Sequence, residues 1–300
     1  MLKVITFASF KPVKFQTLGN LQIFRQTSAL QDYIAAQREQ QKTIGFVPTM
    51  GALHAGHISL VQQCLQENDV CVVSIFVNPT QFNNAEDLEK YPRTEQEDIR
   101  LLENHGCQAV FIPSVQEIYP YGASIGQFDF GTLDKVMEGE HRPGHFAGVA
   151  TVVQALFEAV MPDRAYFGEK DYQQLRIIQD LTAQVQLPIS IVPVSIMREP
   201  DGLAMSSRNV RLSPAMRQEA PIIYQSLQAA AQMLPTHSVQ EINNMVQSKF
   251  RQSNLQLEYF IIADAQHLQP LDSIPPNTEV RAFIAAHAGN VRLIDNTALN

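Results

Sequence analysis

Short apolar runs alternate with amphipathic segments over the first two thirds of the chain. Residues 44–47 and 70–77 are nearly continuous apolar runs, which are typical of strands covered on both faces of a parallel sheet. Between them, Ile58, Val61 and Leu65 recur at helical spacing. Further strands are expected at 109–112, 165–167 and 189–197. This alternation predicts an α/β fold with a doubly wound parallel sheet and right-handed connections.

The segments between these strands have the pattern of helices. Thr94 and Glu97 match a capping box at the start of one of them, and Gly106 follows its expected end. The expected helices cover 27–41, the segment up to about 66, 94–105, 147–160 and 172–184.

The rhythm of alternating strands and helices is lost in the last third of the chain. Helices near 214–234 and 239–251 precede strands near 256–263 and 279–286, which predicts a smaller α+β domain. The boundary is expected between residues 188 and 200. At the other end, the first eighteen residues match a signal peptide poorly, and we expect a loose N-terminal extension over 1–20.

Composition and charge narrow the class of protein. The 300 residues are 45% hydrophobic and 17% charged, as in a globular protein with an ample core. A net charge of −8 without a basic block argues against a nucleic-acid partner, and no apolar run is long enough for a membrane span. Cys64, Cys71 and Cys107 lack metal-ligand spacing, and the first two are expected to be reduced core residues of a cytoplasmic protein.

The stretch at 47–57 carries the strongest candidate chemistry. A strand, a glycine-containing turn and a helix place backbone N–H groups and a positive helix end against a phosphate. Gly51 and Gly56 permit close approach of a ligand, and His54 and His57 would face the same way on the first helical turn. The alternative is an ordinary turn whose histidines only cap the helix or face water.

Other polar motifs follow the predicted strands, at the edge where open α/β sheets bind ligands. One is Asn78-Pro79-Thr80-Gln81-Phe82, and another is Gly168-Glu169-Lys170-Asp171 at a second strand-to-helix turn. A glycine-rich charged loop covers 138–146, and Met205-Ser206-Ser207-Arg208-Asn209 follows the last strand of the first unit.

Together these blocks resemble the pantoate–β-alanine ligase family, over most of the chain from about Gln22. The blocks occur in the family's order at 48–57, 76–82, 91–94, 142–146, 167–171 and 205–209. The resemblance implies a Rossmann-like nucleotidyltransferase domain over 21–195 and a C-terminal lid domain over 196–300, in a homodimer. It also implies the reaction, in which ATP and D-pantoate form pantoyl adenylate and pyrophosphate, and β-alanine then displaces AMP. Departures are mild: Ala55 stands where the family often has an acidic residue, and Ile58 where it often has leucine.

The resemblance also implies roles for individual residues. Charge that grows on the phosphates would be neutralised by the catalytic residues His57, His54, Lys170 and Arg208. Met50, Gln81 and Gln174 would bind pantoate, and Gln81 would also bind β-alanine. ATP would contact Met50, Gly51, Ala52, Leu53, His54, Ala55, Gly56, His57, Gly168, Glu169, Lys170, Asp171, Met197, Met205, Ser206, Ser207 and Arg208.

Several of these roles have competing explanations. The family associates Glu97 and Asp98 with Mg²⁺, but the capping box with Thr94 explains Glu97 equally well. Asp171 would contact the ribose or cap the following helix. Met205 to Arg208 would close on ATP as a mobile clamp or form a polar surface loop. Glu138, Arg142 and His145 would border the pantoate pocket or brace a dimer.

Two rival functions remain open. One is another nucleotidyltransferase with the same His-x-Gly-His motif, such as a cytidylyltransferase, which the two pantoate glutamines and the 142–146 block argue against. The other is a catalytically inactive nucleotide-binding module. The intact set of His54, His57, Lys170 and Arg208 argues against loss of activity.

Overall fold

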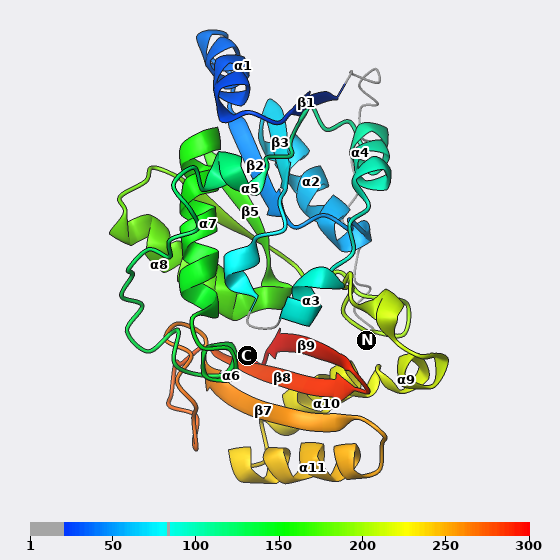
Figure 1. Ribbon diagram of the computed structural model, residues 1–300. Helices are drawn as coiled ribbons and strands as arrows, with labels where there is room; N and C mark the ends of the chain where they lie inside the picture. The colour runs from blue at the N-terminus through cyan, green and yellow to red at the C-terminus, as the bar shows by residue number, and fades with distance from the viewer. Residues whose placement is uncertain (1–20, 83–84) are drawn as a thin grey trace, which may run out of the picture.

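Six parallel strands form the central sheet of the larger unit (Figure 1). The computed structural model describes residues 21–82 and 85–300, so the predicted extension over 1–20 lies outside the described residues. The strand order is β1-β4-β3-β2-β5-β6. The strands are β1 (Gln22–Phe24), β2 (Ile44–Thr49), β3 (Val70–Ile75), β4 (Ala109–Phe111), β5 (Arg164–Gly168) and β6 (Ser190–Val194). From β2 the chain moves outward through β3 and β4 and returns beyond β2 for β5 and β6, so the order reverses between β2 and β5.

Helices cover both faces of this sheet. On one face α2 (Ala55–Glu67) packs against β2, β3 and β5, whereas α7 (His145–Val160) and α8 (Tyr172–Gln184) pack on the other. The other helices of this unit are α1 (Thr27–Glu39), α3 (Ala85–Glu89), α4 (Glu95–Asn104), α5 (Val115–Ile118) and α6 (Glu138–His141). Helix α7 begins at His145, two residues before its predicted start, because the glycine-rich loop ends at Gly144 in a left-handed conformation.

Strand β3 shows why the sequence has a continuous apolar run here. Val70 and Val72 belong to the core beneath α7 and α8, while Cys71 and Val73 belong to the core beneath α2. Every residue of the strand is therefore buried, as predicted for a strand between two helical layers. The cysteines are free and buried, which confirms the predicted core role of Cys64 and Cys71.

The smaller unit is an antiparallel sheet with helices packed against it. Its strands β7 (Gln256–Asp264), β8 (Val280–Ala288) and β9 (Val291–Ala298) lie in the order β7-β8-β9. The single helix predicted at 214–234 is two helices, α9 (Pro214–Glu219) and α10 (Ile222–Met233), because Pro221 interrupts them. Helix α11 (Val239–Arg251) starts with a capping box, and strands β1 and β9 were not predicted.

A buried ion pair joins the two units. The Glu138 carboxylate on α6 accepts hydrogen bonds from Arg292 on β9 at 2.6 and 2.7 Å, and from the Tyr259 hydroxyl on β7 at 2.8 Å. Burial opposes ionisation of Glu138, but the hydrogen bonds and the charge of Arg292 outweigh burial and lower its pKa. The small sheet is thereby fastened below the carboxyl ends of the large one (Figure 1).

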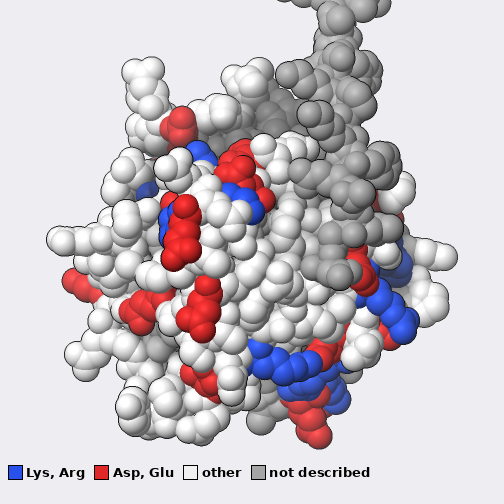
Figure 2. All heavy atoms as spheres, turned by 90° about the horizontal axis from the view of Figure 1, so that it is seen from above, with Lys and Arg blue, Asp and Glu red and all other residues white. Residues whose placement is uncertain are grey.

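Charged side chains of both signs are spread over one face of the molecule (Figure 2). On the face shown in Figure 2, acidic and basic side chains are scattered among uncharged residues rather than gathered by sign. Within the described part of the chain, no helix combines the length and the apolar composition that a membrane span requires. The predicted lack of a nucleic-acid partner continues to rest on the charge balance of the sequence.

Candidate active site

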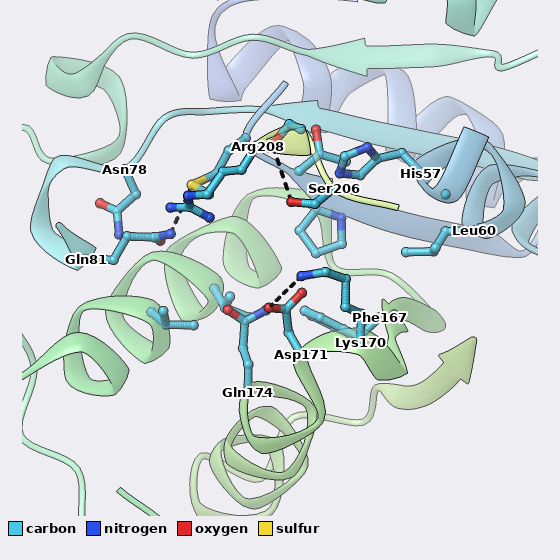
Figure 3. Close-up of a pocket in the computed structure, with 18 of the residues that line it drawn as sticks. His57, Leu60, Asn78, Gln81, Phe167, Lys170, Asp171, Gln174, Ser206 and Arg208 are labelled. Carbon is cyan, nitrogen blue, oxygen red and sulfur yellow. Dashed lines mark hydrogen bonds and ion pairs between the residues drawn. The ribbon is translucent and has the colours of Figure 1, made fainter. Parts of the chain in front are cut away.

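A cavity of about 240 Å³ lies where the strand order reverses, at the carboxyl ends of β2 and β5. The turns after both strands contribute to it, together with the segment after β6. Of the predicted site residues, it is lined by Met50, His54, Gly56, His57, Gln81, Gly168, Lys170, Asp171, Gln174, Met197, Met205, Ser206, Ser207 and Arg208. The sequence motifs therefore meet at one place, although they lie far apart along the chain (Figure 3).

The two histidines cap helix α2 reciprocally. The backbone N–H of Gly56 donates to Nδ1 of His54 at 3.1 Å, and the backbone N–H of His54 donates to Nδ1 of His57 at 3.3 Å. Because each Nδ1 accepts a hydrogen bond, a neutral ring carries its proton on Nε2. The capping interpretation and the phosphate-binding interpretation are therefore compatible, since the cap leaves the Nε2–H donors of both rings available.

Both imidazoles are neutral at physiological pH. Burial lowers the pKa of His54 to about 4, with the charge of Lys170 adding to the effect. Burial likewise lowers the pKa of His57 to about 3, with His54 and Lys170 as further causes. The ring centroids are 4.1 Å apart. A negatively charged ligand would therefore meet two neutral imidazole rings, each of which offers an Nε2–H donor.

Asp98 on α4 holds the loop that precedes the histidines. Its carboxylate accepts the N–H of Ala52 at 2.9 Å and of Leu53 at 2.7 Å, and the Thr94 hydroxyl donates to it at 3.2 Å. Ala52 has a φ of +49°, which a residue with a Cβ adopts only when its surroundings enforce it. Asp98 is 2% exposed, so a buried anion fixes a strained backbone beside the pocket.

The contacts of Asp98 correct one sequence prediction. The Thr94 side chain makes no capping bond to its helix and contacts Asp98 instead, so the predicted capping box with Glu97 is wrong. Glu97 is exposed, and neither Glu97 nor Asp98 lines the main cavity. The metal role of this pair stays a prediction that its contacts do not favour.

Asn78 and Gln81 form a polar platform at the far end of the pocket from His57 (Figure 3). The buried amide of Asn78 donates to the Gln81 side chain and to the Gly148 carbonyl, both at 3.2 Å. A Cβ on Gly148 would lie 2.5 Å from the Thr80 carbonyl oxygen, so only glycine lets α7 approach this turn. The Nε2 of Gln81 lies 2.9 Å from the Met50 sulfur.

His145 and Arg142 brace the same platform from the glycine-rich loop. Nδ1 of His145 lies 2.9 Å from the Gln81 carbonyl oxygen, which only accepts, so the proton is on Nδ1. Its Nε2 then accepts from Arg142 at 3.1 Å. Burial lowers the pKa of His145 to about 4, and the charge of Arg142 lowers it further. Both residues line the cavity, which favours the pocket setting, and the dimer role stays a prediction.

Lys170 and the segment after β6 approach the pocket from opposite sides (Figure 3). The Lys170 ammonium lies 3.9 Å from the Asp171 carboxylate. Asp171 precedes α8 but makes no side-chain capping bond, so capping does not explain its presence. Across the cavity, the backbone N–H of Met205 donates to the Met197 carbonyl at 3.0 Å, and Tyr91 lies 3.4 Å from the Ser207 hydroxyl.

Some predicted residues lie outside the cavity, and some lining residues were not predicted. Gly51, Ala52, Leu53, Ala55 and Glu169 form the turns without lining it. The sequence predicts no role for Tyr91, although this residue stands in one of the six blocks. It also predicts none for the apolar wall on α7 that is formed by Val149, Val152, Val153 and Leu156. That wall follows the helical spacing of an ordinary core face, so no sequence signal separates it from core.

A second space of about 660 Å³ lies between the two units and shares part of its lining with the first. Lys170, Asp171, Ser206 and Arg208 line both spaces. The site can therefore accommodate a ligand larger than the first cavity alone, with Lys170 at the junction.

A glycine turn with paired histidines at the switch point of a parallel sheet, faced by a lysine, defines an enzyme of the Rossmann-like nucleotide-binding class. The family model for pantoate-beta-alanine ligase matches residues 22–298. The chain belongs to this family.

Relatives and solved structures agree with this assignment. The chain is 50% identical to the pantothenate synthetase of Christiangramia forsetii and 48% identical to that of Porphyromonas gingivalis, over 93% and 92% of its length and 100% and 98% of theirs. The pantothenate synthetase structure from Thermus thermophilus has a TM-score of 0.86 at 40% identity, covering 93% of this chain and 99% of that one. The pantoate-beta-alanine ligase structure from Francisella tularensis, a complex with "Beta-gamma ATP and Beta-alanine", has a TM-score of 0.77 at 36% identity, covering 93% of this chain and 98% of that one.

Proposed function

We propose that this protein is an ATP-dependent ligase that condenses D-pantoate with β-alanine to pantothenate, the last step of pantothenate biosynthesis. The reaction passes through pantoyl adenylate and releases pyrophosphate and AMP. The observation that carries the proposal is the meeting of all six family blocks around one cavity, in a chain that matches the family model over residues 22–298.

In the first step, the pantoate carboxylate attacks the α-phosphorus of ATP, and pyrophosphate leaves. A carboxylate needs no general base, so the protein positions the reactants and neutralises growing charge. The Nε2–H groups of His54 and His57 donate to phosphate oxygens, and the Lys170 and Arg208 cations stabilise the leaving pyrophosphate. Neutral histidines suit this role because the donor is already in place.

Recognition of pantoate and β-alanine is assigned to the polar end of the cavity. Gln81 and Gln174 offer amides that both donate and accept, which matches the hydroxyls and carboxylate of pantoate. Met50 and the apolar wall of α7 lie against its methyl groups. Gln81 also receives β-alanine, whose amine then attacks the acyl carbon and displaces AMP. We assign no protein base to that step.

The nucleotide is assigned to the turns around the histidines and the lysine. Asp171 contacts the ribose, and Met197 lies beside the adenine through its backbone. Met205, Ser206, Ser207 and Arg208 form a clamp over the phosphates. The second cavity supports this assignment, because it extends the space beyond Lys170.

Mg²⁺ is proposed to enter with ATP. Among the described residues, no three His, Cys, Asp or Glu side chains gather as a metal cage. A Mg²⁺ ion that arrives with its nucleotide would need few protein ligands, so the residues present are compatible with it. It would supply charge neutralisation on the phosphates. Homodimer formation, the lid role of residues 196–300 and a cytoplasmic location remain predictions.

A coupled assay of AMP release tests the function directly. The reaction contains ATP, Mg²⁺, D-pantoate and β-alanine, and each component is omitted in turn. We expect AMP only when all four are present, with pantothenate identified by its mass. AMP or pyrophosphate release without pantoate, or only with a different carboxylate, would overturn the substrate assignment while leaving the fold assignment intact.

A further inference from the structure

Strand β9 of the small sheet reaches the turn that carries Lys170. In Figure 1 it is the strand of that sheet nearest to the larger unit. The side-chain amide of Asn296 on β9 donates to the backbone carbonyls of Glu169 and Lys170, both at 2.9 Å. Asn296 is 2% exposed, so these bonds are shielded from water.

The orientation of the Asn296 amide follows from its partners. Two carbonyl acceptors on one side require the NH₂ group there, because the amide oxygen cannot donate. The oxygen accepts a hydrogen bond from Arg281, whose guanidinium also lies 3.6 Å from the Glu169 carboxylate. Arg281 is fixed in turn by stacking 4.0 Å above the Tyr172 ring. Both amide hydrogens and the oxygen of Asn296 are therefore engaged, and each bond bears on the turn at 169–171.

Asp295, the residue before Asn296, anchors β9 to the segment that follows β6. Asp295, which is 3% exposed, accepts two parallel hydrogen bonds from Arg198 at 2.6 and 3.0 Å. Arg198 follows Met197 and also donates to the Gly202 carbonyl at 3.1 Å. Two adjacent residues of β9 thus hold two backbone segments of the site. One is the turn at 169–171, which carries Lys170, and the other is the segment from Arg198 onward, which leads to Arg208.

We propose that Asn296 is a positioning residue for adenylate formation, which fixes the Glu169–Lys170 backbone so that the lysine ammonium faces the phosphates of ATP. The inference rests on the proposed function, because it concerns the first half-reaction. Lys170 projects from a short 3₁₀ turn (Glu169–Asp171) rather than from a regular strand or helix. Such a turn has few internal bonds, so its geometry depends on what holds its carbonyls.

The test measures adenylate formation alone, as pantoate-dependent exchange of labelled pyrophosphate into ATP. Asn296→Asp keeps the size of the side chain and the contact with Arg281, but sets a carboxylate oxygen against the two carbonyls. We expect the maximal exchange rate to fall roughly tenfold to hundredfold, because a lysine misplaced by about 1 Å loses that much catalysis. The KM for pantoate should stay within about twofold of its original value.

A second background separates positioning from general stability. In Lys170→Ala protein, Asn296→Asp should change the exchange rate by less than about twofold, because the lysine through which it acts is gone. Ile242→Val, a buried change on α11 in the core of the small unit, should lower thermal stability without changing the exchange rate. If Asn296→Asp folds poorly, Asn296→Ala is tested in the same two backgrounds.

Two results would overturn the inference. One is an equal loss of exchange in both backgrounds, and the other is a lowered melting temperature in Asn296→Asp with an unchanged exchange rate. Failure of the proposed function gives a different result, since the unmodified protein itself would then show no pantoate-dependent exchange.

Discussion

Replacement of Asp98 by asparagine tests whether the buried carboxylate holds the histidine loop or binds metal. The Asp98 carboxylate accepts hydrogen bonds from the backbone N–H groups of Leu53 at 2.7 Å and Ala52 at 2.9 Å. Asp98→Asn keeps one acceptor oxygen, but its NH₂ group must then face one of these two N–H donors. One charge-assisted hydrogen bond is lost and a buried donor is left unpaired. We expect a loss of about 2–4 kcal/mol in the free energy of unfolding.

The catalytic effect should follow from relaxation of the loop. Ala52, with its φ of +49°, would return to an ordinary conformation and carry the start of α2 with it. We expect the rate of pyrophosphate exchange to fall at least tenfold, because the histidine donors lose their alignment. The Mg²⁺ concentration that gives half the maximal rate should not change.

The assay is a Mg²⁺ titration of exchange, combined with urea denaturation of the same protein. Glu97→Gln is the matched control, because Glu97 is exposed on the same helix and should change neither quantity. A rise of tenfold or more in the Mg²⁺ requirement of Asp98→Asn, with unchanged stability, would refute the reasoning and establish the metal role.

Three further predictions concern the pocket. His57→Ala should lower exchange by about 10²-fold or more while costing only about 1 kcal/mol of stability in a urea titration, and near-normal exchange would exclude its role. Gly148→Ala should raise the KM for pantoate and cost about 2 kcal/mol in the same titration, because its Cβ would meet the Thr80 carbonyl at 2.5 Å; an unchanged KM would show that the platform tolerates movement. Acidification should destabilise the protein through His145, whose pKa is about 4 when folded and about 6.5 when unfolded. The unfolded chain takes up a proton below pH 6.5 that the folded one refuses, so stability falls as pH drops through this range, by about 2 kcal/mol at pH 5 for this residue. His145→Gln should lose correspondingly less stability between pH 7 and 5, and an equal loss would contradict the assigned pKa.

The sequence predicted the parallel sheet because its signals are local. The apolar run at β3 is long and continuous, and polar motifs stand directly after the strands, so their meeting at one edge follows from topology alone. Strand β9 was missed because polar residues interrupt its apolar pattern. Asp295 and Asn296 are polar because they bind Arg198 and the turn at 169–171. The role of Asp98 was missed for a similar reason, since its partners are backbone N–H groups 45 residues away or more, which leave no mark on the sequence.

The reciprocal cap of α2 limits how this enzyme can be stabilised by design. Serine and aspartate are preferred at the N-cap, the position just before a helix, and they would cap α2 at position 54 as well as histidine does. The imidazole ring of His54, however, serves both the helix and the pocket. Its Nδ1 accepts a hydrogen bond from the Gly56 N–H of the helix, and its Nε2–H is the donor proposed for the ligand. A screen that selects for heat resistance alone would therefore favour changes at His54 that remove activity.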